Sequence, residues 1–166
     1  MAITPELRRR IRTLLARGPF CFKDPRFCYT LGAWIQELPA EERDQMQCLC
    51  VFRHPSVVVT SVLEEVGSAP YLKGLQLTAE QILQAWEAHY GAVLERQRSQ
   101  GQWLFIHYEE LLQPRGLARL EAFTGLDLDQ SIVDLSLRRS EAHIEATPTS
   151  LRLYQTLLDL AKCEEP

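Results

Sequence analysis

The sequence has no long apolar run. Its longest apolar stretch covers only a few residues around Val57–Val59, whereas a membrane-spanning helix needs about 20. Residues 1–17 contain several arginines but no apolar segment followed by a small-residue cleavage site, so we expect no secretory signal. These two absences predict a cytoplasmic protein without a membrane partner.

The cysteines are irregularly spaced. The five cysteines are an odd number, and they do not form well-spaced pairs with histidines nearby, so neither a disulfide framework nor a zinc site is indicated. Cys48 and Cys50 alternate along an expected strand and therefore face the same side of it. The four histidines show no metal-ligand spacing. We expect reduced, buried thiols and no metal site.

The chain also lacks an excess of positive charge. Its net charge is −4, which argues against a nucleic-acid partner. The first expected helix is an exception, because it concentrates five arginines: Arg8, Arg9, Arg10, Arg12 and Arg17. Such a cluster is either a solvated helix face or a surface that docks an acidic partner.

What the chain does contain is typical of one globular domain. Its 166 residues are 46% hydrophobic and 24% charged, enough for a core. Apolar periodicity, caps and breakers predict strands alternating with helices. The expected strands are 20–22, 46–52 and 103–106, and the expected helices are 4–17, 27–38, 57–66, 78–98, 109–112, 114–124 and 150–163.

This alternation predicts a single α/β domain over residues 1–166, in which helices flank a three-stranded parallel sheet. The helix expected at 57–66 contains a β-branched run from Val57 to Thr60, which by itself would favour a strand. Two element boundaries are well marked. Thr78 and Gln81 form a capping box, and Gly125 is a good C-cap.

The segment from Cys48 to Glu65 carries the clearest chemical signal. It passes from a buried strand through Arg53 and Pro55 into a helix. Ligands of open α/β sheets bind at the carboxyl ends of strands, and a helix N-terminus with an arginine beside it suits an anion. Arg53 is therefore either an anion ligand or the partner of a surface carboxylate. Ser61 by itself is best explained as a helix hydroxyl that bonds back to its own chain.

The stretch from Val51 to Ser61, VFRHPSVVVTS, resembles the 3′-phosphate-binding motif of the sulfotransferases that use 3′-phosphoadenosine 5′-phosphosulfate (PAPS). In that family a strand-end arginine is followed eight positions later by a helix serine. Arg53 and Ser61 stand at this spacing. The resemblance implies that both residues contact the 3′-phosphate of PAPS or of its product, 3′-phosphoadenosine 5′-phosphate (PAP).

Three further segments resemble the same family in the same order. Residues 23–26 (KDPR) followed by Trp34 are similar to the strand-end lysine motif, and Trp86 with Tyr90 is similar to the long helix before the third strand. Residues 106–111 (IHYEEL) are similar to a segment whose tyrosine lies near the adenine, which implies that role for Tyr108; packing in the core is the alternative. A late basic pair, Arg138–Arg139, matches loosely.

The resemblance implies a P-loop NTPase-like fold without its first strand and without the Ser/Gly/Thr-rich loop that surrounds the 5′-phosphosulfate, since no such stretch occurs in the sequence. Lys23 would then polarise the transferring sulfonate. Asp24 is either the general base or the cap of a turn before Pro25, because Pro25 and Phe22 occupy the positions where family members carry the base.

Two functions follow from these residues. One is sulfuryl transfer from PAPS to a hydroxyl or amine group of an unidentified small-molecule acceptor. The other is an inactive sulfotransferase-fold remnant that holds PAP or acts through a protein partner, including a second copy of the chain. Such a remnant would expose the flank of its sheet, and an exposed sheet edge invites pairing.

Overall fold

The structure is a computed structural model of the 166-residue chain. It describes residues 3–135 and 143–163. No helix in these two ranges has both the length and the apolar character that a membrane span requires.

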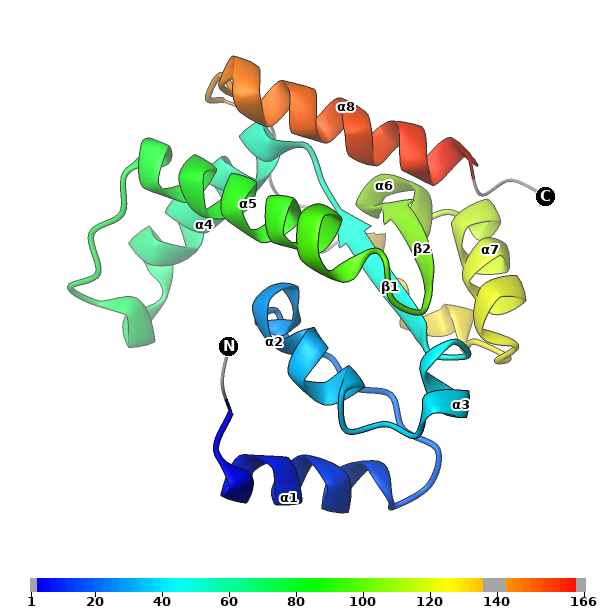
Figure 1. The fold of residues 1–166 in the computed structure, drawn as a ribbon. Coiled ribbons are helices and arrows are strands. Elements are labelled where there is room, and N and C mark those ends of the chain that lie inside the picture. The colour runs from blue at the N-terminus through cyan, green and yellow to red at the C-terminus, as the bar shows by residue number, and fades with distance from the viewer. Residues whose placement is uncertain (1–2, 136–142, 164–166) are drawn as a thin grey trace. The chain divides into compact units, whose positions relative to one another are not determined.

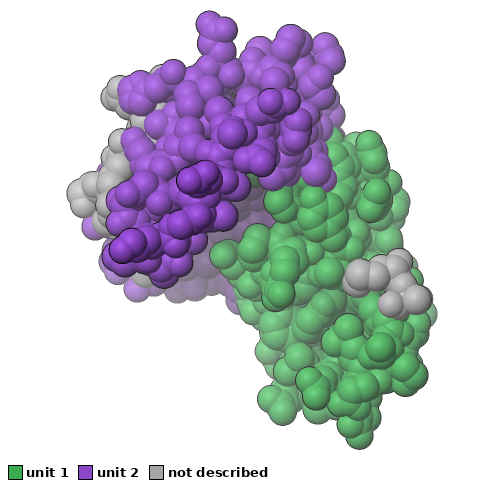
Figure 2. Space-filling view, turned by 90° about the vertical axis from the view of Figure 1, so that its left-hand side faces the viewer, with its two compact units in different colours: residues 1–48, 89–102 green, residues 49–88, 103–166 purple. Residues whose placement is uncertain are grey.

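The chain folds into two compact units, shown in different colours in Figure 2. Unit 1 contains residues 1–48 and 89–102, and unit 2 contains residues 49–88 and 103–166. Each unit is therefore built from two stretches that are separated in sequence. The expectation of one domain over residues 1–166 stays a prediction, and each unit is described by itself.

Unit 1 begins with helix α1 (Pro5–Leu15), which the sequence predicted. Thr4 caps it by accepting a hydrogen bond from the Leu7 amide at 3.2 Å. The unit continues with α2 (Phe27–Ile35) and the short α3 (Ala40–Arg43). Its second stretch contains the end of α5 (Ala79–Ala92) and the π-helix η2 (Val93–Gln97), which packs against α2.

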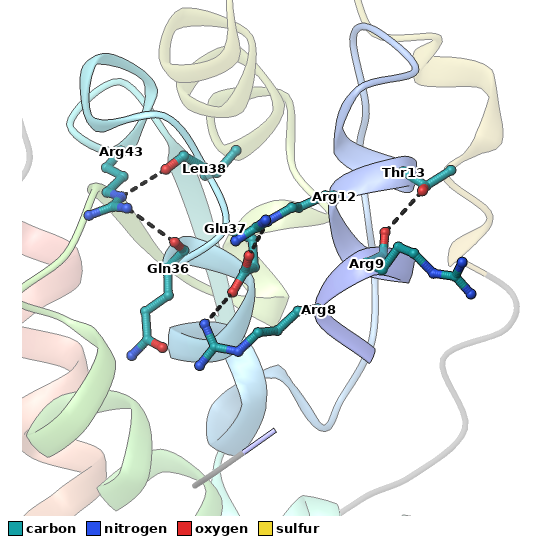
Figure 3. A network of polar contacts seen from close by, with 8 residues as sticks. All are labelled: Arg8, Arg9, Arg12, Thr13, Gln36, Glu37, Leu38 and Arg43. Atoms are coloured by element: carbon teal, nitrogen blue, oxygen red, sulfur yellow. Dashed lines mark hydrogen bonds and ion pairs between the residues drawn. The ribbon is translucent and has the colours of Figure 1, made fainter. Parts of the chain in front are cut away.

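A buried carboxylate joins α1 to the chain that follows α2 (Figure 3). The side chain of Glu37 is 0% exposed and accepts hydrogen bonds from Arg8 at 2.9 Å and Arg12 at 2.5 Å. Arg9 and Arg10 pair instead with Glu6, on their own helix. Four of the five arginines in the basic cluster thus form ion pairs within unit 1, two with each carboxylate.

The strand predicted at residues 20–22 is wrong, because this segment contains no strand. Phe20 and Phe22 point to the same side, and their rings stack on each other with centroids 4.9 Å apart. The Phe22 ring also packs against Trp34 of α2 at 5.2 Å, and Trp34 packs against Phe27 at 5.5 Å. Aromatic contacts, rather than a partner strand, therefore pack this segment against α2.

The sheet consists of two parallel strands, β1 (Gln47–Phe52) and β2 (Gln102–His107), flanked by helices (Figure 1). The protein is a mixed α/β structure that is mostly helical. Phe52, Phe105 and Ile106 are at most 1% exposed and form the centre of the core. Within residues 3–135 and 143–163 the sheet has two strands, not the three that the sequence predicted.

The helices of unit 2 follow the strands closely. Helix α4 (Pro55–Ser68) confirms the helical interpretation of the β-branched run, and its Val59 is fully buried in a cluster with Ile82 and Leu83 of α5. The remaining helices are α6 (Tyr108–Leu111), α7 (Pro114–Thr124) and α8 (Pro148–Cys163), with short 3₁₀ turns η1 (Pro70–Leu72) and η3 (Gln130–Ile132).

Caps fix the ends of these helices as the sequence predicted. Thr78 and Gln81 bond reciprocally, at 2.9 and 3.2 Å, and so form the capping box of α5. Gly125 ends α7 with φ of +68°, a left-handed conformation that favours glycine. The start of α8 is tied to α5, because Glu87 accepts hydrogen bonds from the hydroxyl groups of Thr147 and Ser150.

Gly116 allows α6 and α7 to approach each other closely. A Cβ atom at this position would lie 2.0 Å from the carbonyl oxygen of Glu110, so only glycine fits. Close packing of this turn fixes the backbone that follows β2, where residues of the candidate site lie.

Candidate functional site

The candidate site lies where both strands of unit 2 end. β1 ends at Phe52 and is followed by Arg53, His54 and α4, whereas β2 ends at His107 and is followed directly by α6. Carboxyl ends of parallel strands share one edge of a sheet. α8 passes over this edge (Figure 1), where its Tyr154 contacts residues from both strand ends. We call six residues the strand-end cluster: Arg53, His54, His107, Tyr108, Glu109 and Tyr154.

Arg53 contacts two residues that follow the other strand. Its Cζ atom lies 4.9 Å from the centroid of the Tyr108 ring, a cation–π arrangement. Its Nη2 atom lies 3.6 Å from Oε1 of Glu109. The Arg53 side chain is 18% exposed and that of Glu109 is 28% exposed. Arg53 thus pairs with a carboxylate, which was one of the two alternatives from the sequence. Because its side chain is also partly exposed, the other alternative, binding of an anion, stays open.

The histidines at the two strand ends are helix caps. His54 Nδ1 accepts a hydrogen bond from the Ser56 amide at 3.3 Å, and His107 Nδ1 accepts one from the Glu109 amide at 3.2 Å. An Nδ1 atom that accepts from an amide carries no proton, so both imidazoles are neutral with the proton on Nε2. Burial lowers the pKa of His54 and of His107, which agrees with this state.

Tyr154 connects the two strand ends to α8. Its hydroxyl oxygen lies 3.0 Å from Nε2 of His107, and its ring packs edge-on against His54 and Phe52 with centroids 4.8 and 6.0 Å away. Burial is the largest cause that raises the pKa of Tyr154, and the charge of Glu109 adds to it. The sequence predicts the helix over 150–163 that contains Tyr154 but gives no signal that assigns this residue to the site.

The N-terminus of α4 is already satisfied by the protein. Pro55 has no amide hydrogen, the Ser56 amide bonds to the His54 ring, and the amides of Val57 and Val58 bond to the His54 carbonyl oxygen at 3.1 Å. The first amides of α4 are therefore not free to bind an anion. Binding of an anion at this edge of the sheet would therefore depend mainly on side chains, and the dipole of α4 would add a weaker attraction.

Ser61 lies on α4, about 9 Å along the helix axis from Pro55 at 1.5 Å per residue. It is half-buried. The bond back to the helix that explains many such hydroxyls is made by its neighbour: Thr60 donates to the Ser56 carbonyl at 3.1 Å. In the part of the chain that the structure describes, the Ser61 hydroxyl forms no hydrogen bond.

Lys23 and Asp24 belong to unit 1, whereas Arg53, Ser61 and Tyr108 belong to unit 2. Both Asp24 carboxylate oxygens accept hydrogen bonds from the Arg26 side chain, at 2.6 and 2.9 Å, and Oδ1 also accepts the Arg26 amide at 2.8 Å. These bonds lower the pKa of Asp24 to about 2. A general base needs a pKa near the working pH, so the geometry favours the turn-capping role. Lys23 is exposed.

The buried thiols agree in part with the sequence-based expectation. Cys28, Cys48 and Cys50 are buried and form no disulfide, and burial raises the pKa of Cys48 to about 11, whereas Cys21 is exposed. Among the described residues no group of three or more histidine, cysteine or acidic side chains is arranged to hold a metal ion. The loosely matching pair Arg138–Arg139 lies outside the described residues.

Comparison with protein-family models finds no match, and comparisons with curated proteins and with solved structures find none either. The candidate site therefore stands on the chain's own residues and their geometry.

Proposed function

We propose that the strand-end cluster binds the 3′-phosphate of an adenine nucleotide such as PAPS or PAP. The observation that carries this proposal is the position of Arg53, which follows β1 and is held against Tyr108 from the end of β2. A guanidinium offers a rigid fork of donors that suits phosphate oxygens. The motif resemblance of residues 51–61 supports the same ligand.

Three side chains have separate roles in this proposal. Arg53 supplies the charge and Ser61 supplies a hydroxyl donor from the next turns of α4. Tyr108 uses one face of its ring to hold the guanidinium, so it positions Arg53 in addition to any contact with the base. The proposal also includes a more specific fold than mixed α/β, namely the layered sheet of sulfotransferases and P-loop NTPases.

Sulfuryl transfer from PAPS to a hydroxyl or amine acceptor is the second candidate. The exposed cation Lys23, in a segment that resembles the strand-end lysine motif, favours it. In transfer the bond between sulfur and the bridging oxygen breaks, the acceptor oxygen or nitrogen bonds to sulfur, and a base takes the acceptor proton. Asp24 is poorly suited to be that base, since Arg26 holds it as a stable carboxylate. Nucleotide binding without transfer is therefore the function that the geometry supports best.

Calorimetric titration with PAP tests the proposal, with adenosine as the matched ligand that lacks both phosphates. We expect saturable binding of PAP at low ionic strength and none of adenosine. Equal binding of the two ligands, or no binding of PAP by folded protein, would contradict it. Release of PAP from PAPS in the presence of hydroxyl and amine acceptors tests the second candidate separately.

A further inference from the structure

Two adjacent glutamates on α6, Glu109 and Glu110, form different kinds of contact with arginines. Glu110 accepts a hydrogen bond from Arg119 at 2.6 Å, and Arg119 also donates to the Ala161 carbonyl of α8 at 2.8 Å. This pair is a structural link between α6, α7 and α8. Glu109 lies 3.6 Å from Arg53, beyond the length of a hydrogen bond, so this contact is an ion pair that lacks one.

Arg53 contacts the Tyr108 ring in addition to the Glu109 carboxylate. The Tyr108 ring covers the guanidinium at 4.9 Å and supports it independently of Glu109. Both charged side chains are less than one-third exposed, so solvent screens their interaction less than it would at an open surface. Glu109 therefore neutralises Arg53 at the place where the proposed ligand needs positive charge.

We propose that Glu109 is an internal competitor for Arg53, and that it restricts the site to phosphate monoesters that carry two negative charges. This inference rests on the proposed function. Glu109 already places one negative charge next to Arg53, so a ligand with a single negative charge gains no electrostatic advantage over it. A phosphate monoester does, because its charge is about −1.5 to −2 at pH 7. The ligand class is a nucleotide with a terminal phosphate, such as a 3′-phosphate, rather than a diester or a carboxylate.

The competition does not depend on how far the glutamate moves. If the carboxylate is displaced, the ligand must compete with its attraction to Arg53. If it stays, it repels the ligand from a short distance. Removing the charge strengthens anion binding in either case.

The test is titration of wild-type protein and Glu109→Gln with adenosine 3′-monophosphate, a monoester, and adenosine 2′,3′-cyclic monophosphate, a diester with one charge. Glutamine keeps the shape and polar atoms and removes only the charge. We expect wild-type protein to bind the monoester at least about tenfold more tightly than the diester. We expect Glu109→Gln to bind the monoester about three to ten times more tightly than wild type does.

Glu145→Gln is the matched control, because it removes the same charge from an exposed position of unit 2 that makes no contact with Arg53. Its affinities should equal those of wild type. Circular dichroism confirms folding, and Glu109→Ala replaces Glu109→Gln if the glutamine variant does not fold.

The outcomes separate the two proposals. Unchanged or weaker monoester binding by folded Glu109→Gln, or equal binding of monoester and diester by wild type, would overturn the role of Glu109 while nucleotide binding stands. If neither wild type nor Glu109→Gln binds the monoester or PAP, the strand-end cluster is no anion site and both proposals fall.

Discussion

The hydroxyl oxygen of Tyr154 lies 3.0 Å from Nε2 of His107, and this contact ties α8 to the end of β2. Because His107 Nδ1 accepts the Glu109 amide, Nε2 carries the proton and donates it to the tyrosine oxygen. The strand end, the helix that follows it and the C-terminal helix are thus linked through one imidazole. The same imidazole is next in sequence to Tyr108, which supports Arg53.

Tyr154→Phe should lower the free energy of unfolding by about 1–2 kcal/mol, because the half-buried Nε2 donor of His107 loses its acceptor while the ring packing is kept. Urea unfolding measures this change. Tyr29→Phe is the control, since Tyr29 is exposed, and it should change stability by less than about 0.5 kcal/mol. Equal stability of Tyr154→Phe and wild type would mean that the contact with His107 contributes nothing.

The histidine caps predict a pH dependence of stability. Burial lowers the pKa of His54 and His107 below the ordinary value of 6.5, so between the folded and unfolded pKa values the unfolded chain binds more protons. The contribution of the caps is therefore complete above about pH 6.5 and is lost as the pH falls through the folded pKa values.

His54→Asn separates this effect from other titrating groups. Asparagine is a good N-cap that does not titrate in this range, so the slope of unfolding free energy between pH 7 and pH 5 should be smaller than in wild type. The absolute stability is expected to fall, since the ring contact with Tyr154 is lost. Identical slopes in the two proteins would show that His54 does not act as a neutral cap.

The two glutamates that bind the arginines of α1 should differ in their contribution to stability. Glu37→Gln should lower the free energy of unfolding by about 1–3 kcal/mol, because its carboxylate is fully buried and binds Arg8 and Arg12. Glu6→Gln is the matched control, since its carboxylate binds Arg9 and Arg10 but is 51% exposed. Its effect should be below about 1 kcal/mol. A larger effect at Glu6 than at Glu37 would contradict this account.

Asp24 should titrate near pH 2 when its carboxyl carbon is followed by NMR. Arg26→Gln should raise this pKa toward the ordinary value of about 3.9, because Arg26 supplies the hydrogen bonds that stabilise the carboxylate. A midpoint that does not change in Arg26→Gln would mean that the turn does not hold Asp24 as described. A midpoint above 6 in wild type would restore Asp24 as a general-base candidate.

Local sequence signals predicted most helix and strand positions in this fold. β2 extends one residue beyond its predicted bounds at each end, whereas β1 begins one residue later than predicted and ends at the predicted residue. α4 begins at Pro55, two residues before the predicted helix. These elements depend on caps and apolar patterns within a few residues, which a sequence displays directly. The strand predicted at 20–22 was wrong because three apolar residues cannot indicate whether a partner strand or an aromatic neighbour such as Trp34 will cover them.

The contacts of the candidate site were harder to predict. Arg53 was chosen from the strand-to-helix junction, but its neighbours Tyr108 and Glu109 depend on which strand pairs with β1 and in which register. The capping role of His54 and His107 was missed, although each lies between a strand and a helix, where an N-cap is needed. Their position between a strand and a helix is the sequence signal that could have identified both histidines as N-caps.

Titration of PAP against Arg53→Gln and Arg152→Gln tests the central claim most directly. Both substitutions remove one positive charge from unit 2, but Arg152 is exposed on α8, where it bonds to Thr149. We predict at least about tenfold weaker binding for Arg53→Gln and wild-type affinity for Arg152→Gln. Binding that is equally strong in folded Arg53→Gln and wild type would contradict the assignment of the nucleotide site to the strand-end cluster.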